Sequence, residues 1–564
     1  MRNKSKLAFL SLLPIVMAVS GCSNNNPSPE NQRHFHDKDE SITMTNVIKD
    51  GEKSGYPAPS TGNTRVFVVP VQFTDYPGEE VGKYYNSETK DKKAWKHTDS
   101  TASGRGAENA REDIRKVFFG ESSETMWHSL ASYYKQASYG KLNFNGIVAP
   151  WFDAYTDYTT QKPVTAKEWA EKSSAAQLAQ YILDYYSDDD MERYTIFKDD
   201  NGNTMFNSGK EFLQYFDSNG DGCFDALEMV YSAPYYATYT DSTGKDVAID
   251  NEKFWAYCGG TGTEGNKSKP RLSKWAFQSY YTCFEGGTFD ENGKWRAWTC
   301  EEISSGTAKV DGHTIIHETG HALGLPDYYD YDYKRYPIGN VDMMAYNVGD
   351  HNSYSKSLLG WVDPIVVTGP TTVTINSFTD TGDCIMVPYK TYFQDTDDKY
   401  NNTFYTEYLA IELYTPTGVN ENDSKYSYQS SYPKCPTKTG IKIFHVDSRL
   451  GIYDYSSSTG KFEGYTTSIV STGTSKYVMN ANSNTGSKTV KKDDGGYQWL
   501  IEYVPNSSSN GSTITNDTLF VEGNTFGYDD EYKDYMFNSG NAFGYKFTID
   551  SMSETSATIT FLYA

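Results

Sequence analysis

Four residues near the middle of the chain have the types and spacing of a metal site that activates water: His317, Glu318, His321 and Asp327. Because His317 and His321 lie four residues apart, an α-helix would place both imidazoles on one face, where they could bind one zinc ion. Glu318 would project from an adjacent face and act as the general base on zinc-bound water. Gly324 can end the helix with a positive φ, so that Asp327 returns as a third ligand.

A short segment downstream, Asp342-Met343-Met344-Ala345-Tyr346, predicts a turn beneath the metal ligands, with Met344 as an apolar floor or simply as a core methionine. Tyr346 could donate a hydrogen bond to the developing oxyanion, although chance placement competes in a chain with 48 tyrosines. His313 shares the helix face of His317, but three helical histidines in a row overextend one tetrahedral ion, so we expect His313 to support the site from outside. The methionine segment, the glycine and the third acidic residue argue against a chance H-E-x-x-H sequence.

A second metal site is predicted in residues 217–228, which match the twelve-residue calcium loop. Side-chain oxygens fall at loop positions 1, 3, 5, 9 and 12, a backbone carbonyl is available at position 7, and glycine occupies the sharp turn at position 6. The predicted calcium ligands are Asp217, Asn219, Asp221, Cys223 through its carbonyl, Asp225 and Glu228. A solvated Asx-rich turn is the alternative. We expect a structural ion, because a single loop without a paired helix does not suit a calcium sensor.

The N-terminus predicts export and lipid anchoring. Three basic residues precede an apolar run over residues 7–19, which is too short for a comfortable membrane span and is typical of a signal peptide. The run ends in Val19-Ser20-Gly21-Cys22, which resembles the lipobox of bacterial lipoproteins, whose cysteine is acylated; an ordinary cleavage site with a chance cysteine is the alternative. We therefore expect residues 1–22 to be a lipoprotein signal peptide. Residues 23–63 are expected to be a disordered tether or a short pro-segment, holding the protein at the bacterial cell surface.

Composition restricts the partners of the protein. The 564 residues carry a net charge of -23, so nucleic acid is a poor partner, and we expect membrane contact only through the N-terminal lipid anchor. With Cys22 lipidated, six of the seven cysteines remain, an even number that permits disulfides in an exported protein. The segment Asp290-Glu291-Asn292-Gly293 predicts a hairpin turn that would place Cys283 nearly opposite Cys300. No C-x-x-C pair occurs, which argues against a thiolate zinc site.

The order of expected elements predicts two folded regions. A β-branched and aromatic strand over 64–73, helices over 107–119 and 125–137, and a strand over 141–148 suit an α/β catalytic domain spanning 64–364. Residues 365–564 have short alternating strands separated by serine- and glycine-rich turns, which predict a β-sandwich domain. The clearest of these strands are 371–375, 441–446, 499–503 and 557–561. We also expect an edge strand near the metal to bind substrate backbone, without identifying it.

Several segments together carry a resemblance to a known family. They are HETGHALGLPDYYD at 317–330, VDMMAYN at 341–347, SYSKSLLGWVDP at 353–364, FDSNGDGCFD at 216–225, VFVVPVQFTD at 66–75, SLASYYKQASYGKLNFNG at 129–146, EYLAIELY at 407–414 and TGIKIFHVD at 439–447. They resemble the M6 peptidases, the immune inhibitor A group, over most of residues 64–450. The resemblance implies a metzincin-like α/β (α+β) zinc peptidase domain, with His317, His321 and Asp327 as ligands and Glu318 as base. Val341 departs from the tryptophan frequent in that family, and the long propeptide of many members is absent or reduced.

The expected function is that of a zinc-dependent endopeptidase acting on extracellular proteins and peptides, in a protein that we expect to be a monomer. One alternative is a surface adhesin or glycan-binding lipoprotein, in which the C-terminal β domain binds the partner and the zinc site is vestigial. Intact His317, Glu318 and His321 argue against that decay. A second alternative is a zinc peptidase whose third ligand is a distant glutamate instead of Asp327.

Overall fold

The computed structural model describes residues 27–34, 57–84, 102–199, 201–234, 237–249, 253–261, 265–331, 334–390, 406–429, 432–452, 455–456, 461–462, 469–472, 475–479 and 498–564. The predicted signal peptide and Cys22 lie outside these residues. Across the described ranges, no helix has both the length and the apolar character needed to cross a membrane. The chain has mixed helix and strand content with several sheets, which confirms the α+β class.

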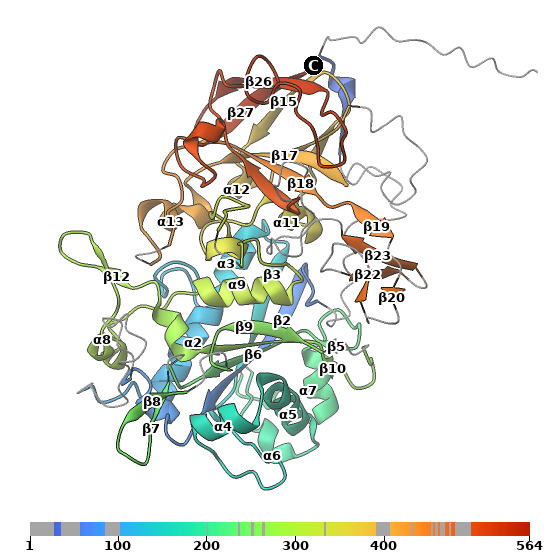
Figure 1. Ribbon diagram of the computed structural model, residues 1–564. Coiled ribbons are helices and arrows are strands. Elements are labelled where there is room, and N and C mark those ends of the chain that lie inside the picture. Colours follow the sequence, from blue (N-terminus) through green and yellow to red (C-terminus); the bar gives the residue numbers. More distant parts are fainter. Residues whose placement is uncertain are drawn as a thin grey trace, which may run out of the picture.

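A mixed sheet organises the first half of the chain (Figure 1). Its strands, in spatial order, are β3 (Leu142–Val148), β2 (Gly62–Gln72), β6 (Ala226–Tyr231), β11 (Lys274–Ser279) and β9 (Tyr257–Gly260), and β4 (Phe152–Asp153) also pairs with β2. The central strands run parallel and are buried on both faces, as their continuous apolar sequences dictate. Only β9 is antiparallel to its neighbour, and it forms one edge.

Helices cover both faces of this sheet, and the alternation of side chains along the strands divides its core into two layers. Val66 and Val68 of β2 pack with one set of helices, whereas Phe67 and Val69 pack with the other. The first set is α2 (Ala107–Phe119), α3 (Leu130–Ala137) and α9 (His313–Ala322). The second set is α4 (Ala166–Lys172), α5 (Ala175–Ser187), α6 (Met191–Tyr194) and α7 (Gly209–Tyr215). In Figure 1, α4 to α7 lie below the sheet and α9 lies above it.

Two sheets dominate the second half. The six-stranded sheet orders β1 (Gln32–His34), β14 (Ile365–Val367), β16 (Cys384–Pro388), β17 (Glu407–Tyr414), β18 (Gly440–Asp447) and β24 (Ile501–Val504). The four-stranded sheet orders β15 (Thr371–Asn376), β27 (Ser556–Tyr563), β26 (Tyr545–Met552) and β25 (Thr525–Phe526). One apolar core contains side chains of both sheets, for example Leu409 and Ile443 with Phe547 and Ile559. The strands expected over 371–375, 441–446, 499–503 and 557–561 all fall in these sheets or within two residues of them.

Shorter elements connect these parts. The helical ones are η1 (Pro29–Asn31), η2 (Gly78–Glu80), η4 (Tyr280–Phe284), α8 (Cys300–Ser305), α10 (Met343–Tyr346), α11 (Ser353–Leu358), α12 (Phe378–Thr381), η6 (Gly418–Asn420), α13 (Glu421–Lys425) and η7 (Ser508–Asn510). The strands are β5 (Cys223–Phe224), β7 (Thr238–Thr240), β8 (Asp246–Ala248), β10 (Arg271–Leu272), β12 (Thr288–Phe289), β13 (Trp295–Arg296), β19 (Leu450–Ile452), β20 (Tyr455–Ser456), β21 (Lys461–Phe462), β22 (Ile469–Thr472) and β23 (Ser475–Met479).

Residues 23–63, expected to be a disordered tether or a short pro-segment, include ordered backbone in their described part. Residues Gln32–His34 pair with β14 as an antiparallel edge strand, although they lie more than 300 positions away from it in sequence. Farther along the chain, the N–H of Ala58 donates to the carbonyl of Ala322 at 2.8 Å, at the end of α9. Backbone hydrogen bonds of this kind require no apolar pattern, so composition did not reveal them.

Two local predictions need correction. The helix expected over 125–137 begins only at Leu130, because Ser129 caps it in a reciprocal capping box with Ser132. The hairpin around Asp290–Gly293 is confirmed by β12 and β13, but each strand has only two residues. Cys283 and Cys300 therefore lie outside the hairpin, in η4 and at the start of α8, and both are thiols.

Candidate metal centre

Helix α9 carries two of the predicted zinc ligands, His317 and His321, and the chain turns back toward them after the helix ends. Gly324 has φ +99°, a conformation that favours glycine. The N–H of Leu325 donates to the carbonyl of Gly320 (3.0 Å), and the N–H of Gly324 donates to that of His321 (3.0 Å). These two bonds form a Schellman motif, which satisfies the last carbonyls of the helix. The helix end inferred from Gly324 is therefore confirmed.

The side chains of His317, His321 and Asp327 converge. One ligand atom from each lies within 4.8 Å of the others, and no other such group of three occurs among the described residues. The Nε2 atoms of His317 and His321 lie 3.0 and 3.2 Å from Asp327 Oδ1. Burial alone would raise the pKa of Asp327, but hydrogen bonds from the two imidazoles hold it well below its usual range.

The other ring nitrogens of the two histidines are also engaged. Nδ1 of His317 lies 2.8 Å from the carbonyl of Met343, and Nδ1 of His321 lies 2.7 Å from that of Leu325. Because a carbonyl can only accept, both Nδ1 atoms carry a proton; the Nε2 atoms donate hydrogen bonds to Asp327 only when the rings are charged, and the neutral rings present an Nε2 lone pair to a metal. Two imidazoles and one carboxylate, with outer partners that fix the tautomers, fit a catalytic zinc ion.

The second carboxylate oxygen of Asp327 has a partner that the sequence did not suggest. The Tyr331 hydroxyl donates to Asp327 Oδ2 at 2.5 Å. This bond fixes the rotation of the carboxylate, so that Oδ1 faces the two histidines. Tyrosine is too common in this chain for its position after Asp327 to have been informative.

Glu318 lies beside the ligand group without belonging to it. Its side chain is buried and lines both cavities that adjoin His317. Burial raises the pKa of Glu318; the nearby His317 and His321 imidazoles oppose that shift most, and a hydrogen bond from the N–H of Cys258 in edge strand β9 opposes it less. A carboxylate in this position, with a raised pKa, is suited to accept and return a proton.

The methionine segment packs under α9. Met344 is fully buried, and its carbonyl accepts the N–H of Tyr328 at 2.8 Å. A Cβ atom on Gly320 would come within 2.4 Å of Met344 Sδ, so the helix and the methionine approach closely because position 320 lacks a side chain. Tyr346, the predicted oxyanion donor, lines the same cavity as His317 and Glu318.

His313 does not join the ligand group. Its Nδ1 lies 2.9 Å from Asp311 Oδ1, and its Nε2 lies 3.2 Å from Asp423 Oδ1. Burial alone would lower the pKa of His313, but the two carboxylates outweigh it and raise that pKa to about 9. This buried ion triad connects the start of α9 to α13 of the second half.

The predicted calcium loop, between α7 and β5, forms Asx-type turns. The N–H of Asp221 donates to Asn219 Oδ1 (3.1 Å), and the N–H of Cys223 donates to Asp221 Oδ1 (2.8 Å). Asp217 Oδ2 accepts the N–H of Gly222 (3.0 Å), whereas its buried Oδ1 has no hydrogen-bond partner among the described residues. A cation bound in the loop would satisfy that oxygen.

The last predicted calcium ligand points away from the loop. Asp225 faces the loop and accepts the N–H of Ser218 at 3.1 Å. Glu228 is three residues farther on, in β6, where the alternation of a strand turns it to the opposite face. Gln278 and Thr319 donate to its two carboxylate oxygens at 3.2 and 3.3 Å. Glu228, the expected ligand at loop position 12, therefore does not reach the loop. It lies in strand β6, whereas the calcium-loop pattern has a helix at this point.

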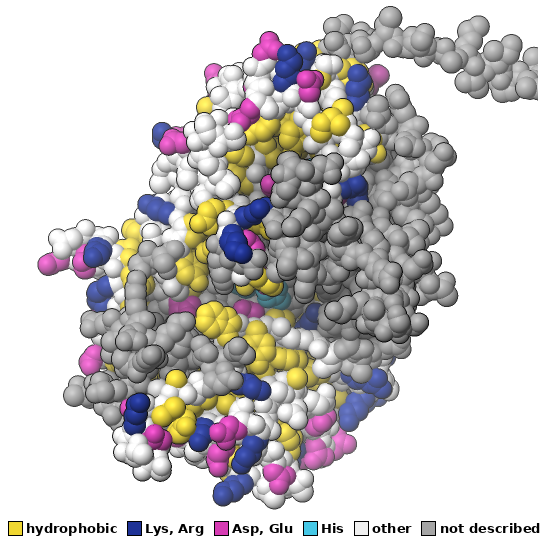
Figure 2. All heavy atoms as spheres, viewed as in Figure 1, with side chains coloured by type: hydrophobic (Ala, Val, Ile, Leu, Met, Phe, Trp, Pro, Cys, Tyr) yellow, Lys and Arg dark blue, Asp and Glu magenta, His cyan; other side chains and the backbone are white. Residues whose placement is uncertain are grey.

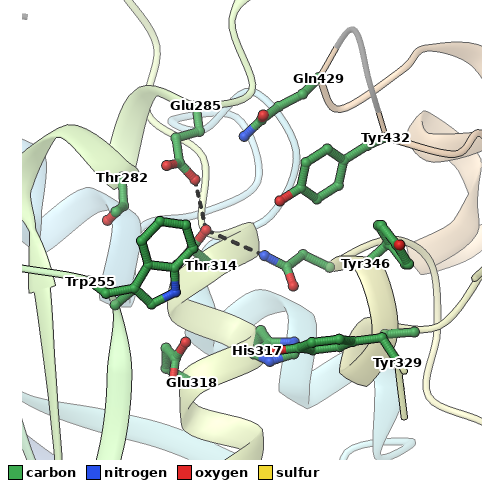
Figure 3. A pocket seen from close by; sticks show the side chains of 13 residues that line it. Trp255, Thr282, Glu285, Thr314, His317, Glu318, Tyr329, Tyr346, Gln429 and Tyr432 are labelled. Atoms are coloured by element: carbon green, nitrogen blue, oxygen red, sulfur yellow. Dashed lines mark hydrogen bonds between the residues drawn. The ribbon is translucent and has the colours of Figure 1, made fainter. Parts of the chain in front are cut away.

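Two adjoining cavities share His317 and Glu318 and lie beside the segment that leads into and forms edge strand β9. Figure 2 shows a histidine in the hollow between the lower and upper parts of the molecule, with acidic side chains beside it. The second cavity, of about 460 Å³, is lined by Tyr257–Gly260 together with His321 and Asp327. The first, of about 290 Å³, is shown in Figure 3 and is lined by Trp255, Ala256, Thr282, Glu285, Thr314, His317, Glu318, Tyr329, Ala345, Tyr346, Asn347, Gln429 and Tyr432.

Comparison of the chain with protein-family models and with curated protein sequences finds no match.

Proposed function

We propose that this protein is a zinc-dependent endopeptidase that hydrolyses extracellular proteins. One observation carries the proposal: His317, His321 and Asp327 bring three ligand atoms within 4.8 Å of one another, beside the buried carboxylate of Glu318. Zinc bound there would lower the pKa of its water to about 7 and polarise the scissile carbonyl. Glu318 would accept the proton of the attacking water and deliver it to the leaving amine.

Strand β9 is suited to hold the substrate backbone. Among the described residues it is the edge of its sheet and pairs with β11 alone, and its residues line the cavity that contains the ligand group. An extended peptide can add to such an edge by main-chain hydrogen bonds, whatever its sequence. The N–H of Cys258, within β9, donates to Glu318, so the same strand positions both the proposed base and the substrate.

The proposal extends to the fold of the two regions, to a calcium ion and to lipid anchoring. The resemblance to M6 peptidases supports a metzincin-like catalytic domain, and the shared core of the two later sheets supports a β-sandwich domain. We also propose a structural calcium ion in the loop that begins at Asp217, and lipid anchoring outside the cytoplasm through Cys22. Tyr346 lies on the cavity wall, which is compatible with oxyanion stabilisation.

The test is hydrolysis of casein by zinc-loaded wild type and by Glu318→Gln. We expect the variant to retain the fold and one zinc ion but to lose activity by at least about 1,000-fold, because the base is absent. Glu301→Gln, an exposed change in α8, is the matched control and should retain wild-type activity. Wild-type rates in Glu318→Gln would refute the assignment, and zinc binding without hydrolysis by wild type would favour a binding protein.

A further inference from the structure

The cavity beside Glu318 has a second carboxylate at its far end. Glu285 lies between η4 and β12, and its Oε2 accepts the hydroxyls of Thr314 (2.8 Å) and Tyr428 (2.9 Å). Figure 3 shows Glu285, Gln429 and Tyr432 on the side of the cavity away from His317 and Glu318. A substrate side chain that enters from the metal would therefore meet Glu285 last.

Helix α9 gives the depth of the cavity. Thr314, which contacts Glu285, precedes Glu318 by four residues on the same helix. Four residues of an α-helix rise about 6 Å, so Glu285 lies about one turn from the proposed base. A short side chain would not span that depth, whereas the long stems of lysine and arginine suit it.

The charges of the cavity favour a cation. Its described lining includes the carboxylates of Glu285 and Glu318 but neither lysine nor arginine. The nearby His313 is already paired with Asp311 and Asp423, and no ion pair is formed by Glu285 within the described residues. Burial raises the pKa of Glu285 to about 7, which a bound cation would reverse.

The walls suit the aliphatic stem of such a side chain. Aromatic rings of Trp255, Tyr329, Tyr346 and Tyr432 line the cavity. The Tyr346 and Tyr432 rings lie at 5.8 Å and form an edge-to-face pair. Aromatic faces attract ammonium and guanidinium groups as well as methylene stems. The aromatic walls of the cavity and the carboxylate of Glu285 at its end therefore both favour basic side chains.

The direction of β9 assigns the cavity to one substrate position. Trp255 and Ala256, which precede β9, line both cavities, whereas Tyr257–Gly260 line the cavity with His321 and Asp327 but not the cavity with Glu285. Antiparallel pairing is the slightly more stable arrangement, and a substrate antiparallel to β9 would run from Gly260 toward Trp255. The residue after the scissile bond, P1′, would then face the cavity that contains Glu285.

We propose that this cavity binds the P1′ side chain of the substrate and selects lysine and arginine at that position. Glu285 is the residue that determines this selection. The inference rests on the proposed endopeptidase function and adds the substrate class to it.

The experiment is cleavage-site mapping by mass spectrometry, with a denatured protein library and the zinc-loaded full chain at pH 8. We expect wild type to cleave mainly before lysine and arginine. Glu285→Gln should reduce kcat/KM for peptides with P1′ lysine about 10- to 100-fold and leave peptides with P1′ methionine within about 3-fold. Charge reversal in Glu285→Lys should move the preference toward acidic P1′ residues.

The outcomes separate the two proposals. Cleavage without enrichment of basic P1′ residues, or an unchanged preference in both Glu285 variants, would overturn the pocket assignment while preserving the peptidase. Absence of all cleavage by zinc-loaded wild type would overturn the peptidase and the pocket together. Loss of cleavage of every peptide in Glu285→Gln, with normal folding, would make Glu285 a structural group and likewise overturn its selective role.

Discussion

The buried triad of Asp311, His313 and Asp423 makes a quantitative prediction about stability. His313 is 3 % exposed and lies between the two carboxylates. Its pKa rises from 6.5 to about 9 on folding, which at about 1.4 kcal/mol per unit corresponds to about 3 kcal/mol. Because the folded pKa is the higher one, this stabilisation is present below pH 6.5 and disappears as the pH rises through about 9.

The perturbation that tests this is His313→Gln, which keeps a polar side chain but removes the titrating charge. Urea unfolding with saturating zinc should show the variant about 3 kcal/mol less stable than wild type at pH 7, with most of that difference gone at pH 9.5. His128→Gln is the matched control, because burial lowers the pKa of His128 to about 4 and keeps it neutral at both values. An equal difference for His313→Gln at pH 7 and 9.5 would refute the ion triad.

Four further predictions concern the metal sites and the pocket. Asp327→Ala should weaken zinc binding by more than about 100-fold in competition titrations, whereas unchanged zinc stoichiometry and affinity would favour a different third ligand. Gly320→Ala should lower the free energy of unfolding by about 1–3 kcal/mol through its clash with Met344, and Met344→Ala in the same chain should recover part of the loss; no recovery would place the strain elsewhere. The preference for P1′ lysine over methionine should strengthen between pH 6 and 8 as Glu285 ionises, given its pKa of about 7 beside Thr314, Tyr428, Asp311 and His313; a flat ratio would contradict this. Calcium should raise the Tm of wild type but not that of Asp217→Asn. An unchanged wild-type Tm after addition of a chelator that spares zinc would contradict a bound ion in the loop.

The convergence of His317, His321 and Asp327 was predictable because these residues are close together in sequence. His317 and His321 share a helix face by spacing alone, and Gly324 returns the chain within six residues of His321 to Asp327. The partners that complete the site are not local. Glu285 and Cys258 come from other elements, and only the packing of α9 on the sheet brings them to Thr314 and Glu318.

The incorrect expectations have equally specific causes. A calcium pattern fixes sequence positions but not the element that follows, and strand β6 rotates Glu228 to the face of α9. The capping box at Ser129 shortened the helix expected from residue 125. The edge strand Gln32–His34 is too short for a periodic pattern, so nothing in its composition distinguished it from a tether.

The central claim is tested most directly by titrating zinc into chelator-stripped protein while following peptide cleavage. The proposed centre predicts no cleavage without metal and full recovery at one zinc per chain, with Glu318→Gln binding the same equivalent and remaining inactive. Cleavage by the metal-free protein, or one bound zinc with no hydrolysis of any peptide by wild type, would contradict it.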